Sequence, residues 1–283
     1  MLHNDEGAGG RAGQHVGGGA YPCPHWTYEG LRSALGISRP HTGSSGAIPD
    51  GRNTGIHPSL PPSAGPHGQH HWAEGHPACG GRAQSPIDIR TSGVQTDPSL
   101  PPISPEGYES PGAALLALSN NGHTAVLELP PALRLRGLPR SFAAEQLHFH
   151  WGGGGGSGGA EHVVDGHRAA AESMGMHVVH YDAERYGNAS EAQHHSGGLA
   201  VLGVLLEVGP APHPAYANIL QHLGSIRYAG QRTSIPPFSI RDLLPPRLDL
   251  YYRYNGSLST PPCLQGVLWT LFQEPVRISQ AQV

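Results

Sequence analysis

The segment QLHFHW at 146–151 places two histidines, His148 and His150, one residue apart between bulky apolar side chains. Side chains alternate between the two faces of a β-strand, so both imidazoles are expected to point to the same face. Their separation along the strand would be about 7 Å. The pattern therefore predicts one surface that carries two imidazoles, backed by apolar residues on the other face.

A second apolar segment, MHVVHY at 176–181, carries His177 and His180. Three positions separate these histidines, so on a strand only one of them can face the same side as the first pair. Three neutral imidazoles from adjacent strands suit Zn²⁺ with a fourth position left open for water, as in catalytic zinc sites. Zinc held in this way lowers the pKa of its water to about 7.

Packing in the core, or hydrogen bonding to the backbone, is the alternative for these histidines. The chain contains 20 histidines, so some pairs with this spacing arise by chance. The second histidine segment strengthens the metal hypothesis without deciding it.

Strands must position such ligands, and from about residue 79 the chain consists of short apolar or alternating runs. Strands are expected at AVLEL (125–129), QLHFHW (146–151), MHVVHY (176–181), LAVLGVLLEV (199–208) and GVLWTLF (266–272). A helix is expected over 215–227, because Ile219, Leu220, Leu223 and Ile226 recur at helical spacing. The glycine-rich run 152–159 predicts a flexible loop after the first histidine strand.

Composition limits the fold and the partners. The net charge is −4 and charged residues make up 13% of the chain, with no dense Lys/Arg cluster. This balance argues against nucleic acid or an anionic membrane surface and favours a small neutral or anionic substrate. The 41 Gly and 28 Pro residues predict many turns and few long helices. We expect one β-dominated, mixed α/β domain, for which 283 residues suffice.

Two stretches carry no pattern that could build a core. Residues 1–20 are rich in glycine, which predicts a disordered tail. Residues 31–65 are rich in Gly, Pro and Ser and are expected to form a disordered insert. The domain is expected to span residues 21–283, interrupted by this insert.

The indications of a cellular compartment disagree. Cys23, Cys79 and Cys263 form no CxxC pattern, and they permit one disulfide with one thiol left over. Asn188 and Asn255 begin Asn-X-Ser triplets and are candidate glycan acceptors in a secretory compartment. The sequence nevertheless shows no recognisable signal peptide and no run of about 20 apolar residues that could span a membrane.

Ordered motifs give the chain a clear resemblance. QSPIDI (84–89), NNGH (120–123), QLHFHWG (146–152), AEH (160–162), MHVVHY (176–181), GLAVLGVLLEVG (198–209) and NGSLSTPPC (255–263) together resemble the α-class carbonic anhydrases. HWTYEG (25–30), PHGQHHW (66–72), SIPPF (234–238) and YYRYNGS (251–257) resemble the extracellular, membrane-anchored members in particular. The similarity covers residues 25–30 and 66–283.

The resemblance implies a fold, a cofactor and a reaction. The implied fold is a single domain around a large, twisted, mostly antiparallel β-sheet with short flanking helices. The implied cofactor is Zn²⁺, and the implied reaction is the reversible hydration of carbon dioxide to bicarbonate and a proton. The implied location is the extracellular face of the plasma membrane, or outside the cell after secretion.

The resemblance also implies roles for individual residues. His148, His150 and His177 match the zinc ligands, with His180 on the back of the strand. Glu161 matches a carboxylate that orients a hydroxyl. Ser259 matches the position of that hydroxyl, and Gln146 matches the amide that holds His148.

The resemblance assigns further roles around the metal. His123 matches the proton shuttle, Tyr28 belongs to the solvent network, and Thr260 lies at the substrate end. Cys79 and Cys263 match the disulfide. The apolar wall for carbon dioxide would consist of Val179, Val201, Leu258, Val267 and Trp269.

Some of these matches have simpler interpretations when read alone. His123 follows Asn-Gly and would otherwise be a surface turn residue, and the apolar residues would simply be core. Ser259 stands where the family normally has threonine. Serine keeps the hydroxyl but lacks the methyl group that restricts its rotamer, so we expect retained chemistry with looser orientation.

Two departures from the family bear on activity. The family has a supporting glutamate two residues before the third ligand, whereas Glu172 stands five residues before His177 and needs a bulge at 173–175 to reach it. The chain also stops at residue 283, before a terminal segment that in the family supports the middle ligand, and the signal peptide and membrane anchor expected of the family are absent from the given sequence. We therefore expect a domain truncated at its C-terminus.

Two other functions stay open at this point. A carbonic-anhydrase-like binding module without catalysis would result if the insert at 173–175 misplaces His177 or if the missing C-terminal segment prevents folding. A structural zinc protein would need a fourth protein ligand, for which the sequence offers no suitable candidate.

Overall fold

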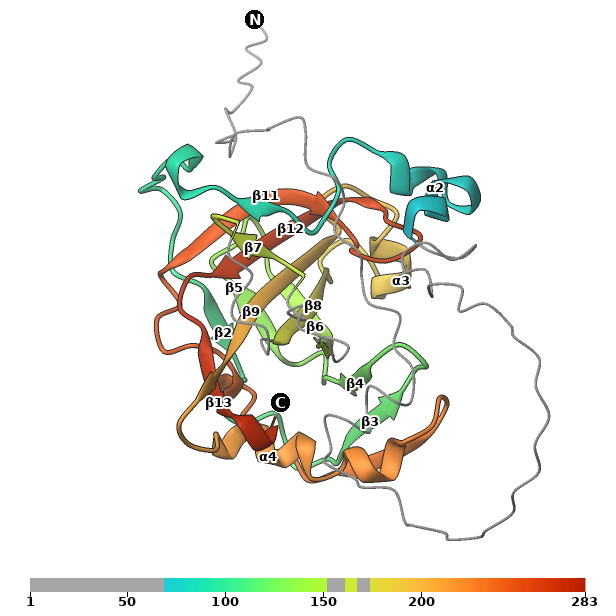
Figure 1. The fold of residues 1–283 in the computed structure, drawn as a ribbon, viewed down its shortest axis with the longest axis vertical. Helices are drawn as coiled ribbons and strands as arrows, with labels where there is room; N and C mark the ends of the chain where they lie inside the picture. The colour runs from blue at the N-terminus through green and yellow to red at the C-terminus, as the bar shows by residue number, and fades with distance from the viewer. Residues whose placement is uncertain (1–68, 152–160, 167–173, 283) are drawn as a thin grey trace, which may run out of the picture.

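The computed structural model describes residues 69–151, 161–166 and 174–282. In this part of the chain an eleven-stranded sheet dominates, accompanied by a sheet of two strands and by short helices (Figure 1). The expected tail at 1–20, the insert at 31–65 and the glycine loop at 152–159 lie outside the described residues. No helix within the described ranges is long and apolar enough to cross a membrane.

The centre of the large sheet consists of four strands. They are β6 (Phe142–His150), β8 (Met174–Asp182), β9 (Leu199–Gly209) and β12 (Gln265–Phe272). β6 pairs antiparallel with β8 and β8 with β9, whereas β9 and β12 run parallel. Together with β4 (Ala125–Glu128), these strands contain nearly all residues of the five predicted segments. The prediction of a mixed, mostly antiparallel sheet is confirmed.

Shorter strands extend this centre in both directions. The strand order is β10-β3-β4-β6-β8-β9-β12-β11, with β13 on β9 and with β5 joining β2 to β6. The additional strands of this sheet are β2 (Ser104–Glu106), β3 (Leu116–Asn120), β5 (Arg134–Arg136), β10 (Arg232–Ile235), β11 (Tyr251–Ser257) and β13 (Val276–Ser279). β1 (Asp88–Ile89) and β7 (Val163–Val164) form the separate parallel pair.

Within the described residues the helices are all short. The α-helices are α2 (Trp72–Gly75), α3 (Ala189–Ala192) and α4 (Pro214–Leu220), and α4 lies on the opposite side of the molecule from the other two (Figure 1). The 3-10 turns are η2 (Gln69–His71), η3 (Pro77–Gly80), η4 (Thr91–Gly93), η5 (Leu223–Ile226), η6 (Arg241–Leu243) and η7 (Gln280–Gln282).

The prediction of one helix over residues 215–227 is wrong in the length of the helix. The α-helix ends at Leu220, and η5 follows after a break. The hydrogen bond from the His222 amide to the Ile219 carbonyl already has 3-10 spacing. His222 and Gly224 have low helix propensity, so the α-helix does not continue through this stretch. Ile219 and Ile226 are nevertheless both buried, as the apolar pattern predicted.

The two faces of the central strands pack into different clusters. Leu147, Phe149, Met176 and Val178 belong to the larger core on one face. Fully burying side chains of this size contributes about 1.5–3 kcal/mol each. The other face carries a smaller apolar cluster, whose buried members are Ala143, Tyr181, Ala192, Leu199, Val201, Val267 and Trp269. The histidines of QLHFHW therefore point away from the larger core.

A β-bulge in β6 decides which residues face which cluster. The register against β8 shifts between Ala144 and Gln146, so that Glu145 is the extra residue. Phe142 and Ala144 before the bulge belong to the larger core, and so do Leu147 and Phe149 after it. Without the bulge, strict alternation would place His148 on the same face as Ala144.

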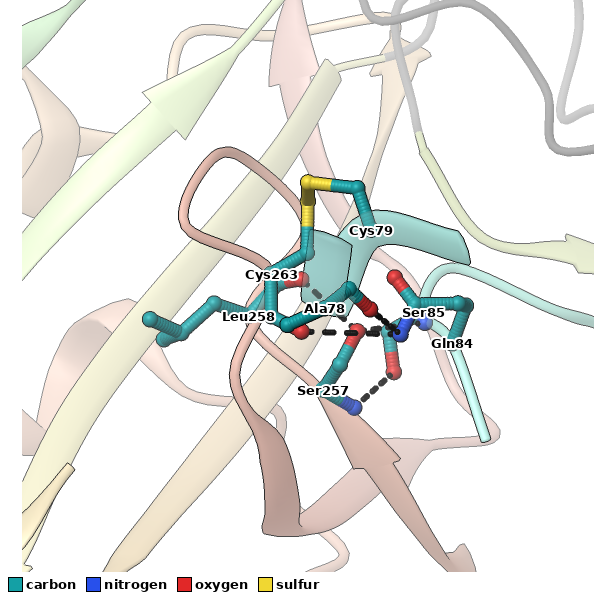
Figure 2. Close-up of a disulfide and its surroundings, with 7 residues drawn as sticks. All are labelled: Ala78, Cys79, Gln84, Ser85, Ser257, Leu258 and Cys263. Atoms are coloured by element: carbon teal, nitrogen blue, oxygen red, sulfur yellow. Dashed lines mark hydrogen bonds between the residues drawn. A yellow bond between two sulfur atoms is a disulfide. The ribbon is translucent and has the colours of Figure 1, made fainter. Parts of the chain in front are cut away.

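A disulfide ties the start of the described chain to the loop after β11. Cys79 in η3 is bonded to Cys263, so the predicted pairing is confirmed (Figure 2). The Gln84 side-chain amide donates to the carbonyl of Ala78, 2.9 Å away. Beside this contact, the Ser85 amide donates to the Ser257 hydroxyl at 2.9 Å, and the Ser257 amide donates to the Ser85 hydroxyl at 3.0 Å. We call this set of contacts the disulfide clamp.

Removing the disulfide should destabilise the protein markedly. The bond closes a loop with a sequence separation of 184 residues, so it restricts the unfolded chain strongly. We expect Cys79→Ser/Cys263→Ser to lower the free energy of unfolding by about 2–5 kcal/mol, measured by urea denaturation. Dithiothreitol should destabilise the wild type and leave the double variant unchanged. Equal unfolding midpoints for wild type and double variant would contradict the expectation.

Candidate metal centre

Three histidines meet on the face of the sheet that carries the smaller cluster. His148 lies directly opposite His177 across the antiparallel β6–β8 pair, and His150 lies two residues further along β6. Directly opposed residues of antiparallel strands point to the same face. The candidate ligand atoms of these three side chains all lie within 4.8 Å of one another. We call this set the histidine triad.

His180 points to the back of β8, as its odd separation from His177 predicted. Its ring is fully buried, with Nδ1 donating to the carbonyl of Ala200 at 3.2 Å. Its Nε2 accepts from the hydroxyl of Tyr108. For this histidine, the alternative of a hydrogen-bonded core residue is correct.

Hydrogen bonds leave ring nitrogens of the triad available to a metal. Nδ1 of His148 donates to the side-chain oxygen of Gln146 at 3.0 Å, so Nε2 carries the lone pair. Nε2 of His150 is buried and has no hydrogen-bond partner among the described residues. A buried polar atom without a partner costs about 1–3 kcal/mol, which a bound ion would offset.

Burial keeps the triad neutral. Desolvation lowers the pKa of His148 and that of His150 to about 3, and it lowers the pKa of His177 well below the ordinary value. Metal binding requires neutral imidazoles, and three of them suit zinc with an open fourth position. The donor set and the unpartnered nitrogen of His150 therefore fit a zinc ion.

Comparisons with known proteins agree with this geometry. A family model described as eukaryotic-type carbonic anhydrase matches residues 67–283. The chain belongs to this family. The human protein carbonic anhydrase 12 is 46% identical over 219 residues, which is 77% of this chain and 61% of the relative. Human carbonic anhydrase 6 is 41% identical over 216 residues, which is 75% of this chain and 68% of the relative. The chain thus spans less than two thirds of carbonic anhydrase 12.

Glu161 places a buried carboxylate beside the histidine triad. One carboxylate oxygen lies 3.3 Å from Nδ1 of His150, and the other lies 3.7 Å from Nδ1 of His177. The carboxylate therefore faces the two ligands that Gln146 does not contact. Ser259 is half-buried in the turn between β11 and Cys263, beside Leu258 of the smaller cluster.

The residues predicted to hold carbon dioxide share one cluster. Val201, Val267 and Trp269 are buried members of the smaller cluster, and Val179 and Leu258 pack against it. Val179, Val201 and Trp269 are aligned across β8, β9 and β12. Thr260 is exposed, and its carbonyl accepts the amide hydrogen of Cys263 at 2.9 Å. The functional roles of these residues stay predictions.

The remaining predicted site residues lie at the surface or outside the described chain. His123 is exposed in the turn between β3 and β4, where the Asn121 side chain accepts its amide hydrogen at 2.9 Å. Its backbone thus forms the surface turn that the Asn-Gly sequence predicted. Tyr28 and Glu172 lie outside the described residues.

Sequence reasoning missed two polar residues beside the triad. His162 is buried, and its Nε2 lies 2.6 Å from the hydroxyl of Tyr254 on β11. The His162 ring contacts the rings of His177 and Trp269. Both residues occur in quoted motifs, AEH and YYRYNGS, but no local pattern connects positions so far apart in the chain.

The metal-free protein should lose stability as the pH falls from 7 to 5. The folded state holds the pKa of His148 and His150 at about 3 and that of His162 and His180 at about 4. Histidines of the unfolded chain titrate near 6.5, so below that pH the unfolded state binds more protons. The free energy of unfolding is therefore highest above the pKa of the unfolded histidines and falls progressively as the pH drops below it. Urea midpoints of chelator-treated protein should fall over this range.

A matched variant separates buried from exposed histidines in this experiment. His123→Ala removes an exposed imidazole and should leave the pH dependence unchanged. His162→Gln removes a buried one and should make it shallower. A urea midpoint that is constant between pH 7 and pH 5 would be evidence against neutral buried imidazoles.

Proposed function

We propose that this protein catalyses the reversible hydration of carbon dioxide to bicarbonate and a proton, with zinc as its cofactor. The observation that carries the proposal is the meeting of three neutral imidazoles within 4.8 Å, two of them buried and that of His148 half-buried, on a sheet face shared with a small apolar cluster. A bound zinc ion supplies a Lewis acid that lowers the pKa of a coordinated water to about 7. His148, His150 and His177 would hold it.

Glu161 and Ser259 orient the attacking oxygen in this proposal. The Ser259 hydroxyl accepts a hydrogen bond from that oxygen and donates its own proton to Glu161, which aims a lone pair at the carbon of carbon dioxide. A carboxylate suits this role because, when ionised, it only accepts hydrogen bonds. Gln146 keeps His148 in the required tautomer. β8 pairs with β9 in regular register from Met174 to His177, so Glu172 could support His177 only through a bulge before Met174. The Ser259 side chain lacks a methyl group, so its orientation is less restricted than that of threonine.

The apolar wall binds the substrate and keeps competing water out. Carbon dioxide has no net dipole, so Val179, Val201, Leu258, Val267 and Trp269 offer it a favourable surface near the triad. Thr260 lies at the outer end of this wall. His123 and Tyr28 serve the proton that hydration releases, with His123 passing it to buffer and Tyr28 in the solvent network.

We also propose an extracellular or secreted location and a single domain over residues 21–283. The Cys79–Cys263 disulfide supports this location, because disulfides persist in oxidising compartments. The side chains of Asn188 and Asn255 are exposed, as glycan acceptors must be.

The test is stopped-flow hydration of carbon dioxide on the purified chain, with bound zinc measured in the same sample. We expect rapid hydration with about one zinc per chain. His177→Ala should reduce the hydration rate and the zinc affinity by at least about 100-fold each, since even the partners of metal ligands contribute 10–100-fold to affinity or activity. His180→Gln is the matched control on the same strand and should keep its zinc. Zinc binding without hydration in the wild type would contradict the proposed reaction.

The shuttle role of His123 gives a separate prediction. His123→Ala should lower the hydration rate in dilute buffer by at least about 10-fold, because positioned proton transfer contributes strongly to catalysis. Concentrated imidazole buffer should restore the rate, and zinc content should be unchanged. If His123→Ala hydrates carbon dioxide as fast as the wild type in dilute buffer, the assignment of His123 as the shuttle is wrong.

A further inference from the structure

His162 is a buried imidazole that the proposed reaction does not use. It is 2% exposed, and its ring centroid lies 4.7 Å from that of Trp269 and 5.8 Å from that of His177. The rings of His162 and His177 meet edge to face at 81°. A side chain in this position restrains a metal ligand without being one.

A chain of hydrogen bonds fixes the ring of His162. The Tyr254 hydroxyl lies 2.6 Å from Nε2 of His162 and donates to the Ser85 hydroxyl at 2.9 Å. With the tyrosine proton directed at Ser85, Nε2 of His162 carries a proton and donates to the Tyr254 oxygen. The chain ends at Ser85 and Ser257 in the disulfide clamp (Figure 2).

Trp269 restrains His177 from a second direction. Its ring centroid lies 4.8 Å from that of His177, at an interplanar angle of 76°. The indole nitrogen donates to the carbonyl of Ser257 at 2.9 Å, and the indole stacks on the Tyr254 ring at 8°. His162 and Trp269, the two rings outside the triad that contact His177 in the described part of the chain, are therefore both held by β11.

Glu161 depends on the same anchor, because it precedes His162 directly. The backbone of this stretch is held by β7, which pairs with β1 over only two residues. A side-chain anchor at His162 therefore adds a restraint directly next to Glu161. The carboxylate of Glu161 faces Nδ1 of both His150 and His177.

We propose that the hydroxyl of Tyr254, acting through His162, positions His177 and Glu161 and thereby sets the affinity of the histidine triad for its metal. Tyr254 is a positioning residue, since it acts through His162 and Trp269. The proposal rests on the proposed zinc site, but it concerns metal affinity and not the reaction that follows.

The test compares Tyr254→Phe with Tyr251→Phe on the same strand. Both variants remove one phenolic hydroxyl with a single mutation, but Tyr251 donates to the carbonyl of Pro101 and packs against the larger core. Zinc affinity is measured by competition with a chromogenic chelator, and ligand geometry by the visible spectrum of the cobalt-substituted protein. Thermal unfolding of both variants reports stability separately.

We expect Tyr254→Phe to weaken zinc binding by about 10-fold and to shift the cobalt spectrum, since partners of metal ligands typically contribute 10–100-fold. Tyr251→Phe should leave both unchanged. Unchanged zinc affinity in Tyr254→Phe, or an equal loss in both variants, would overturn the positioning role. If the wild type binds zinc, Tyr254→Phe binds it more weakly and neither hydrates carbon dioxide, the proposed reaction fails while the positioning role stands.

Discussion

The pairing of β6 with β8 is the constraint on which the site depends. The bulge at Glu145 shifts the alternation of β6 by one residue. Each residue after the bulge therefore points to the face opposite to the one that regular alternation from Ala144 would give it. The same pairing then sets His148 directly opposite His177. A register slip of one residue would send both imidazoles of QLHFHW into the larger core. The chemistry is therefore inseparable from this register.

The site is assembled at a cost to stability. The imidazoles of His150 and His177 and the carboxylate of Glu161 are removed from water on one sheet face, and Nε2 of His150 has no hydrogen-bond partner among the described residues. The fold tolerates this because the larger core lies on the other face of the same strands. A ligand that binds only the folded state stabilises it by mass action. A metal at the triad therefore compensates for the polar groups that the fold has buried.

Alternation predicted much of this arrangement, because it is a local property of a strand. It placed His148 with His150 and required that only one of His177 and His180 join them. It could not show the bulge, since the position of an extra residue is decided by pairing with β8. It also missed the contact of His162 with Tyr254, which are 92 positions apart. The motifs assigned roles to Ser259 and His123 only through the resemblance.

β11 shows how a peripheral element comes to support the centre. It is the last strand of the order β10-β3-β4-β6-β8-β9-β12-β11 and pairs only with β12 among the described strands. Its other edge is therefore not held by a neighbouring strand. The disulfide clamp supplies the missing restraint through Ser85 and Ser257. Tyr254 lies on this strand, and Ser259 follows its end. The anchor of His162 is thus connected to the disulfide clamp through the hydrogen bond of Tyr254 to Ser85, and Ser259 lies four residues before the bonded Cys263.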